Sequence, residues 1–299
     1  MTLEVGVKDQ VRKFYEAVGW QQIGKGLYQN ARYEDLRPVS REYLHRCHLR
    51  VAHYLPAEGE YLLDAGSGPI QYPEYLEYSR GFRYRVCLDI SRLALTEARE
   101  RLGAHGLCVL GDVARLPFET GAFAGLVSLH TIHHLPADEH EVAVRGFYRS
   151  LQSGGRAVVV YSWGERSGLM RLAAPLVHLA SGVRRLFRRL RGSVPRLKGP
   201  GEAERLLAQP GTYTFRHDYE WFQRTLGDLA GFEIRVWRSV STEFLRAFIH
   251  PKLLGGPLLK LLYWLEERLP HFLGRHGQYP MVLFQKDGPS RVNGRGRGE

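Results

Sequence analysis

The sequence predicts an α/β protein with a seven-stranded, mostly parallel sheet and helices on both of its faces. Three observations predict this fold class. From Glu60 onward, short apolar runs alternate with helical patterns, which is typical of parallel strands joined by helices. The first apolar run ends in the glycine-bent turn D-A-G-S-G-P, which begins at Asp64. Acidic residues also close the second run, at Asp89, and follow the third, at Asp112.

A helical extension is expected before this alternation. Apolar residues at helical spacing predict a helix over 6–20 that ends at Gly19. Ser40 is the expected N-cap of a second helix, which runs to Tyr54, and the segment Leu27–Leu36 between the two helices is predicted to be a loop. The seven predicted strands are Tyr61–Ala65, Tyr84–Asp89, Leu107–Leu110, Ala124–His130, Arg156–Ser162, Phe232–Arg238 and Pro280–Gln285.

The other helices are predicted between and after these strands. They are expected at 72–80, 92–102, 138–151, 166–209, 218–231 and 241–273, the last with a break at 251–257. The chain is therefore divided into a helical cap (1–57), a core (58–163), a basic helical insertion or lid (164–215), the rest of the fold with a helical insertion (216–286) and a Gly/Arg-rich tail predicted to be disordered (287–299).

Composition excludes several classes of protein. The chain is 44% apolar and 24% charged, as in ordinary globular proteins, and its three cysteines are too scattered for a disulfide framework or a zinc site. The N-terminus lacks a signal-peptide pattern, and no run of about 18 apolar residues predicts a membrane span. We therefore expect a cytoplasmic protein. The net charge is +11, and +7 of it lies between Glu165 and Arg205.

The acids at the strand ends indicate a nucleoside ligand. A carboxylate at Asp89, closing the second strand, is placed to accept both hydroxyls of a ribose, as dinucleotide and S-adenosyl ligands require. Gln71 stands where the dinucleotide fingerprint G-x-G-x-x-G has its third glycine, which argues against a pyrophosphate. Asp112 is placed to accept from an exocyclic adenine amine, with the Val113 N–H available to a ring nitrogen.

Five segments together resemble the class I S-adenosylmethionine-dependent methyltransferases. They are L-L-D-A-G-S-G-P, V-C-L-D-I-S, G-D-V-A-R-L-P-F, F-A-G-L-V-S-L-H-T-I-H-H-L-P and L-Q-S-G-G-R-A-V-V-V, in the order and at the spacing of that family. Within that family, the chain resembles most the type 11 branch, which is typified by the ubiquinone and menaquinone C-methyltransferases. The resemblance covers residues 58–163 closely. It implies a Rossmann-like fold, methyl transfer, and S-adenosyl-L-methionine as the cofactor.

The resemblance also implies individual roles. The glycine turn would line the methionine end of the cofactor, the second acid would take the ribose hydroxyls, the third acid and the residue after it would bind the adenine edge, and the chain after the fourth strand would pass the sulfonium. Ile70 stands where the family has its third glycine. The implied cofactor-binding residues are Asp64, Gly66, Gly68, Asp89, Ile90, Asp112, Val113 and His130.

Two neighbouring histidines are the catalytic candidates. Such an enzyme mainly holds acceptor and methyl group in line, and an oxygen or carbon acceptor also needs a base. His133 and His134 lie beside the end of the fourth strand, and imidazole is the natural base near neutral pH. The alternative is that this H-H-L sequence is a structural junction. H-x-x-H-H lacks the glutamate of a helical zinc motif, so no metal is expected.

The basic insertion bears on the acceptor. Residues 169–191 place leucines and Val183 on one helical stripe, with arginines gathered in the second half. We weigh three interpretations: a lid over the acceptor site, an amphipathic helix on the anionic inner face of a membrane, and an RNA-binding patch. The leading expectation is a methyltransferase acting on a small-molecule acceptor, lipid-like or a glycan. An RNA-directed methyltransferase and a non-catalytic S-adenosylmethionine-binding protein are the alternatives.

Overall fold

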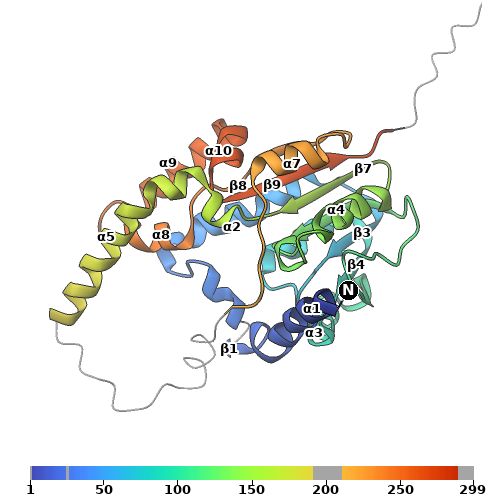
Figure 1. The fold of residues 1–299 in the computed structure, drawn as a ribbon, viewed down its shortest axis with the longest axis horizontal. Coiled ribbons are helices and arrows are strands. Elements are labelled where there is room, and N and C mark those ends of the chain that lie inside the picture. The colour runs from blue at the N-terminus through green and yellow to red at the C-terminus, as the bar shows by residue number, and fades with distance from the viewer. Residues whose placement is uncertain (1, 25–26, 191–210, 289–299) are drawn as a thin grey trace, which may run out of the picture.

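The computed structural model describes residues 2–24, 27–190 and 211–288. Its centre is one seven-stranded sheet (Figure 1), as the sequence predicts. The strands are β3 (Gly59–Ala65), β4 (Phe82–Asp89), β5 (Gly106–Leu110), β6 (Phe123–Leu129), β7 (Leu151–Val160), β8 (Glu233–Arg238) and β9 (Tyr279–Gln285).

The strand order is β5-β4-β3-β6-β7-β9-β8. The first five strands of this order are parallel, and β9 runs antiparallel to both β7 and β8. After β3 the chain builds one half of the sheet, and it then crosses back to place β6 on the other side of β3. Open α/β sheets bind ligands outside the carboxyl ends of the strands at such a reversal. The fold therefore predicts a site at the ends of β3 and β6.

Helices cover both faces of the sheet (Figure 1). Successive residues of one strand face opposite sides, as Leu62 and Leu63 of β3 show by packing in different apolar clusters. Both are fully buried, as expected of a parallel strand covered on two sides. The helices are α1 (Thr2–Phe14), α2 (Arg41–Arg50), α3 (Arg92–Leu102), α4 (Glu139–Ser150), α5 (Gly168–Leu190), α7 (Tyr219–Leu226), α8 (Thr242–Phe248), α9 (Gly255–Arg268) and α10 (Pro270–His276).

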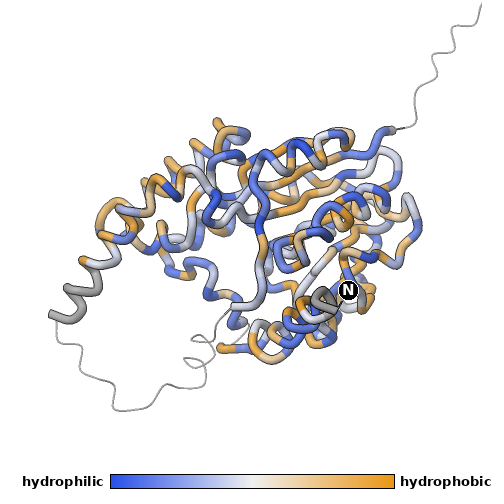
Figure 2. Tube along the Cα trace, in the orientation of Figure 1, coloured by the Kyte–Doolittle hydropathy of each residue, from blue (hydrophilic) through white to orange (hydrophobic). Residues whose placement is uncertain are grey.

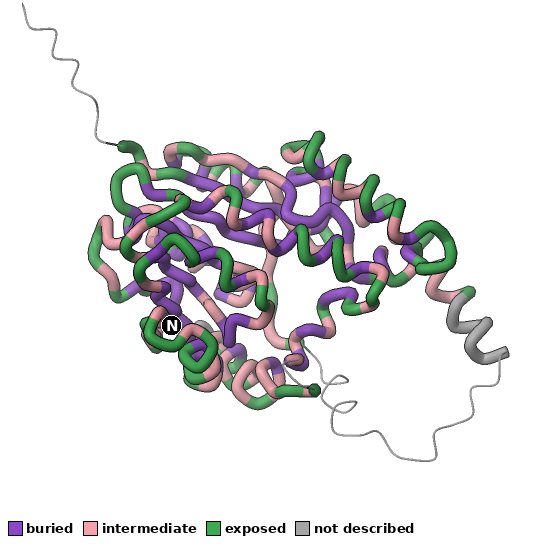
Figure 3. Tube along the Cα trace, turned by 180° about the vertical axis from the view of Figure 1, so that it is seen from behind, coloured by how far each residue is buried: buried purple, intermediate pink, exposed green. Residues whose placement is uncertain are grey.

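Figure 2 shows apolar residues along the central strands and on α5 and α9, and Figure 3 shows the burial of the strands. None of the helices in the described ranges is both long enough and apolar enough to cross a membrane. The predicted disordered tail lies outside the described residues from position 289 onward, as do residues 191–210 of the basic insertion.

One prediction for the N-terminal region is wrong, and another holds only for the position of the residue. The segment Leu27–Leu36 is not simply a loop, because β2 (Leu27–Tyr28) pairs with β1 (Gln22–Gly24) and a 3₁₀ turn follows at Gln29–Tyr33. A two-residue strand has too short a pattern to be found without its partner. Ser40 is the N-cap residue of α2, as predicted, but its side chain makes no capping hydrogen bond, and its hydroxyl donates to Asp35 Oδ2 at 2.5 Å.

Two other elements differ in kind or extent. The helix expected at 72–80 is a 3₁₀ helix over Pro73–Ser79. The fourth strand ends at Leu129, one residue earlier than predicted, and His130 adopts φ +56°, in the left-handed region. Its N–H still donates to Val160 O at 2.9 Å. His130 therefore turns out of the sheet at the edge where the site is expected.

Candidate active site

A cavity of about 380 Å³ opens at the carboxyl edge of the parallel strands. It runs along the ends of β3, β4, β5 and β6, and residues of the N-terminal segment close one side of it. All ten residues that the sequence predicts for the cofactor or for catalysis line this cavity: Asp64, Gly66, Gly68, Asp89, Ile90, Asp112, Val113, His130, His133 and His134. The structure thus brings together side chains from four strand ends.

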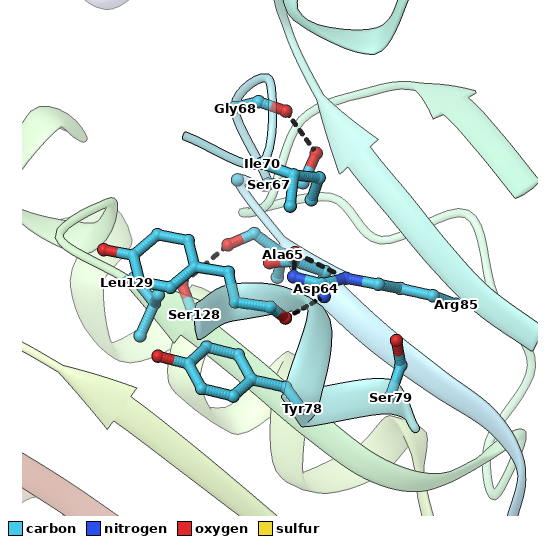
Figure 4. Close-up of polar contacts among 12 residues, drawn as sticks. Asp64, Ala65, Ser67, Gly68, Ile70, Tyr78, Ser79, Arg85, Ser128 and Leu129 are labelled. Atoms are coloured by element: carbon cyan, nitrogen blue, oxygen red, sulfur yellow. Dashed lines mark hydrogen bonds and ion pairs between the residues drawn. The ribbon is translucent and has the colours of Figure 1, made fainter. Parts of the chain in front are cut away.

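Asp64 is engaged below the cavity by a residue that the sequence analysis missed. Arg85 of β4 is fully buried, and its Nε donates to Asp64 Oδ2 at 3.0 Å, while its Nη2 donates to the same oxygen (Figure 4). Burial raises the pKa of the Asp64 carboxyl, and Arg85 opposes that shift. Asp64 therefore combines a structural ion pair with a place in the cavity wall. An arginine at the start of the buried run R-V-C-L-D of β4 was the available signal.

The glycine turn fits a close-approaching ligand. Gly66 has φ +77°, and a Cβ added there would lie 2.3 Å from the Thr131 side chain. Gly68 has φ +56°, and its added Cβ would lie 3.0 Å from the Trp20 ring. Both positions therefore require the left-handed conformation and the bare backbone that glycine provides. Ile70, at the family's third glycine position, is buried and has φ +53°, a conformation that β-branched residues rarely adopt.

Asp89 is fixed by the turn it faces. Its Oδ2 accepts from Gly68 N at 2.9 Å and its Oδ1 accepts from Ser91 N at 2.8 Å. Burial raises the pKa of Asp89 to about 6, against the opposing effect of these backbone donors. Each carboxylate oxygen keeps a second lone pair, so the group can still accept from the two hydroxyls of a ribose. Its position beside Gly68 fits a nucleoside at the β4 end.

Asp112 is held by a lysine from the N-terminal helix. Lys8 of α1 donates to Asp112 Oδ2 at 2.5 Å and also pairs with Glu139 at the start of α4. The other oxygen, Oδ1, accepts from Ala114 N at 2.9 Å. The N-terminal extension thus covers the adenine end that the resemblance implies. No sequence pattern linked Lys8 to Asp112, because 104 positions separate them.

The two catalytic candidates differ in their surroundings. His134 Nδ1 lies 2.8 Å from the carbonyl of Tyr213, which can only accept, so Nδ1 carries the proton. The Tyr15 hydroxyl, 2.8 Å away, then donates to Nε2. Both ring nitrogens of His134 are therefore hydrogen-bonded. His133 is buried and its Nδ1 has no partner among the described residues.

The three histidines at this strand end are held neutral. Burial lowers the pKa of His134 to about 4 and that of His130 to about 3. Burial also lowers the pKa of His133, and the neighbouring His134 and the Arg216 cation add to the effect. A neutral imidazole can act as a general base, but it cannot act as a general acid in the way that an imidazolium does. In the described part of the chain, no group of three His, Cys, Asp or Glu side chains is arranged to hold a metal ion.

The other half of the cavity was not foreseen. It is lined by aromatic and basic side chains from the C-terminal strands and from the segment after the insertion, including Arg216, Arg238 and Tyr279. No described residue of α5 lines it, whereas Gly211, Thr212 and Thr214, at the end of the predicted insertion (164–215), do. Arg238 ends β8 in V-W-R-S, and a charged residue closing a buried strand was the signal for it.

Comparison with known proteins identifies the core. The family described as a methyltransferase domain matches residues 63–159, which contain the glycine turn, all three acids and the histidines. Residues 63–159 form a class I methyltransferase domain, whose cofactor is S-adenosyl-L-methionine. The methyltransferase domain is the part of the sheet from β3 to β7, and the residues that fit the cofactor lie at its strand ends.

Relatives agree on the fold and differ in substrate. A tRNA (carboxymethyluridine(34)-5-O)-methyltransferase of Xenopus tropicalis is 26% identical over 140 residues, which are 42% of this chain and 22% of that protein. The structure of a Haemonchus contortus phosphoethanolamine N-methyltransferase, bound to phosphoethanolamine and S-adenosylhomocysteine, is 12% identical with a TM-score of 0.56, covering 97% of this chain and 51% of the other. A magnesium protoporphyrin IX methyltransferase of Synechocystis is 14% identical with a TM-score of 0.50, covering 94% of this chain and 100% of the other. This chain therefore spans about a fifth of the curated relative and about half of the phosphoethanolamine enzyme.

Proposed function

We propose that this chain transfers a methyl group from S-adenosyl-L-methionine to a small-molecule acceptor, lipid-like or a glycan, bound in the half of the cavity beyond His130. One observation supports it most: a single cavity joins the acid-bearing ends of β3, β4 and β5 to side chains at β8 and β9. The cofactor, when bound, supplies an activated methyl group. Asp89 and the glycine turn would hold it, and the N-terminal segment would exclude water.

We retain the five-part division of the chain as part of this proposal. The cap (1–57) would close the cofactor half, and the core (58–163) would bind the cofactor. The C-terminal part (216–286) would supply the acceptor half, because Arg238 and Tyr279 line the cavity there.

A methyl-transfer assay tests the proposal. The protein is incubated with methyl-labelled S-adenosyl-L-methionine and a cell extract separated into lipid, small polar and RNA fractions. Label is expected in the lipid or small polar fraction, and none with Asp89→Ala. Label in the RNA fraction would instead favour the RNA-directed alternative, to which the name of the Xenopus relative points. Absence of label from every fraction, with cofactor binding intact, would favour a non-catalytic protein.

We assign the base, where the acceptor needs one, to His133 and a positioning role to His134. Of these two rings, that of His133 has a buried nitrogen with no partner among the described residues, whereas His134 is bonded to Tyr15 and Tyr213. His133→Ala is expected to lower kcat by about a hundredfold or more, with cofactor affinity unchanged. His134→Gln, which can keep both hydrogen bonds, should lower kcat much less.

The pH profile checks the same assignment. A base must be unprotonated to act, and the pKa of His133 lies well below its usual range, so the rate should stay flat as the pH falls through the ordinary histidine range near 6.5. An inflection of kcat near that pH would contradict the lowered pKa of His133, and an inflection that persists in His133→Ala would belong to another group.

We also propose that the protein contacts an anionic membrane surface peripherally through α5, within residues 169–191. α5 projects from the end of the molecule (Figures 1 and 3), and Leu172 is 80% exposed, Leu176 59% and Leu179 67%. Exposed apolar residues also occur on α9, where Leu261 and Trp264 are about half exposed. Apolar area beside basic charge is the pattern of interfacial helices.

Vesicle sedimentation tests this contact. The parent protein should sediment with phosphatidylglycerol vesicles and much less with phosphatidylcholine vesicles. Replacing Leu172, Leu176 and Leu179 by serine should reduce sedimentation about tenfold or more, since each buried CH₂ contributes about 0.8 kcal/mol. Val142→Ser, at an exposed site on α4, is the matched control. Equal sedimentation of the parent and the triple variant would contradict the assignment.

A further inference from the structure

Two arginines in the acceptor half of the cavity have donors without acceptors. Arg238 is 1% exposed, and its Nε and Nη1 have no hydrogen-bond partner within the described parts of the chain. Its remaining nitrogen, Nη2, donates weakly to Thr242 Oγ1 at 3.4 Å. Arg216 also lines the cavity, and its buried Nε is likewise unpartnered among described residues. Buried polar groups are nearly always hydrogen-bonded, so unpartnered guanidinium donors in a cavity wall require an explanation.

The acids of the cavity have hydrogen-bond partners other than these two arginines. Asp64 pairs with Arg85, Asp112 with Lys8, and Glu34 accepts from His48 Nε2 at 3.0 Å. That last pair is charged, since the pKa of Glu34 is lowered to about 2 and the pKa of His48 is raised to about 9, and His48 Nδ1 also lies 3.7 Å from Glu74 Oε2. Asp89 is bonded to backbone N–H groups.

No ion pair joins Arg238 or Arg216 to an acid in the described ranges. Glu34 helps to raise the pKa of Arg238 through space, but no acid in the described part of the chain hydrogen-bonds to either guanidinium.

Two aromatic rings lie within cation–π distance of the Arg238 guanidinium. Its Cζ lies 4.5 Å from the centre of the Tyr279 ring and 5.3 Å from that of Trp237. The His130 ring packs against the same two aromatic rings, at 5.0 Å from Trp237 and 5.6 Å from Tyr279. A stacked guanidinium presents its N–H groups edge-on, in a fork that matches two oxygens of one anion.

The place of Arg238 in the sheet separates it from the nucleoside half. β8 lies three strands from β6, roughly 14 Å at about 4.8 Å per strand, and on the opposite side from β4 and β5. Asp89 and Asp112, which fit the nucleoside, lie at or after the ends of β4 and β5. Arg238 therefore faces the part of the cavity left for the acceptor.

We infer that the acceptor carries an anionic group, a carboxylate or a phosphate, that Arg238 and Arg216 bind beyond His130. This inference rests on the proposed methyl transfer and specifies its substrate class. Arg238 anchors the anion in a bidentate contact, and Arg216 adds a second donor from the segment before α7. The contact fixes the end of the acceptor away from the methyl group, and thereby orients its nucleophile toward the cofactor half.

Calorimetry with simple probes tests the inference. The protein is first saturated with S-adenosylhomocysteine, and failure of that step would count against the proposed function rather than against the anion site. Benzoate, phenyl phosphate and uncharged benzyl alcohol are then titrated at constant ionic strength and low chloride. One of the two charged probes is expected to bind about tenfold or more tightly than benzyl alcohol, and the preferred one identifies a carboxylate or a phosphate.

The variants assign the binding to the two arginines. Arg238→Gln should remove the preference for the charged probe, and Arg216→Gln should reduce it in part. Arg235→Gln is the control, because Arg235 lies on the same strand and its Nε donates to Glu233 at 2.7 Å. Should Arg238→Gln fail to fold, Arg216→Gln decides the outcome by itself. Equal binding of charged and neutral probes, an unchanged preference in a folded variant, or loss of S-adenosylhomocysteine affinity instead of anion affinity would each overturn the inference.

Discussion

Asp89→Ala is expected to weaken S-adenosylhomocysteine binding about a hundredfold, the largest single effect on the cofactor site. The carboxylate would accept both ribose hydroxyls, and each hydrogen bond to a charged group contributes about 1.5–3 kcal/mol. The substitution also frees the N–H groups of Gly68 and Ser91, which the carboxylate holds at 2.9 and 2.8 Å. Titration calorimetry measures the change in affinity.

Asp228→Ala is the matched control for this variant. Asp228 is an exposed carboxylate that pairs with Arg145 away from the cavity, so its loss should leave cofactor affinity unchanged. A cofactor affinity within about threefold of the parent in a folded Asp89→Ala protein would contradict the assignment of Asp89 to the ribose, since one such hydrogen bond alone contributes more.

The pH dependence follows from the same carboxyl. Its pKa in the folded protein is about 6, above the usual value for aspartate, because it is buried. The ionised form is the better ribose acceptor, so cofactor affinity should fall as the pH drops below about 6. The stability of the ligand-free protein should change in the opposite direction. A raised pKa disfavours the ionised form, so the contribution of Asp89 to stability is greatest below pH 4 and declines as the pH rises through 6.

Arg85→Met is expected to destabilise the protein by about 3–5 kcal/mol, the largest effect on stability. Methionine fills much of the volume of arginine, but it leaves the buried Asp64 carboxylate without the two donors it now accepts from. It also removes a donor to the Tyr75 carbonyl. Urea denaturation at neutral pH measures the free energy of unfolding. A decrease in the free energy of unfolding below about 1 kcal/mol is typical of exposed ion pairs, and it would contradict the assignment of Arg85 as the partner of a buried carboxylate.

The double variant Asp64→Leu/Arg85→Met separates the charge from the packing. Replacing both partners with apolar residues removes the uncompensated buried carboxylate, so much of the lost stability should return. Without Arg85 the pKa of Asp64 should rise further, because burial then acts unopposed. The deficit of Arg85→Met should therefore shrink as the pH falls and Asp64 takes up a proton. A deficit independent of pH would indicate a packing defect instead.

The cofactor half of the site could be predicted from the sequence, because it is built by strands that follow one another along the chain. Asp64 and Asp89 lie at the carboxyl ends of β3 and β4, and Asp112 follows β5. Parallel strands bring these ends to one edge of the sheet, whatever the loops between them do. The apolar runs located all seven strands, most clearly the central ones, which are buried on both faces.

The remainder depends on contacts that no local pattern records. Arg238 reaches the cavity only because β8 pairs with β9 and β9 with β7, an order that differs from the order along the chain. Lys8 reaches Asp112 across the cavity from α1. Tyr28 was expected in a loop, and its complete burial depends on a two-residue strand and on Arg101, whose Nη2 donates to its hydroxyl at 2.9 Å. Sequence order could not reveal these neighbours.

The measurement that tests the central claim most directly is a calorimetric titration of the purified, folded protein with S-adenosyl-L-methionine at neutral pH. The account predicts saturable binding of one molecule per chain, which Asp89→Ala weakens about a hundredfold and Asp228→Ala leaves unchanged. Absence of binding heat, together with no rise in the unfolding temperature on adding the cofactor, would contradict the claim that this cavity is a methyltransferase active site.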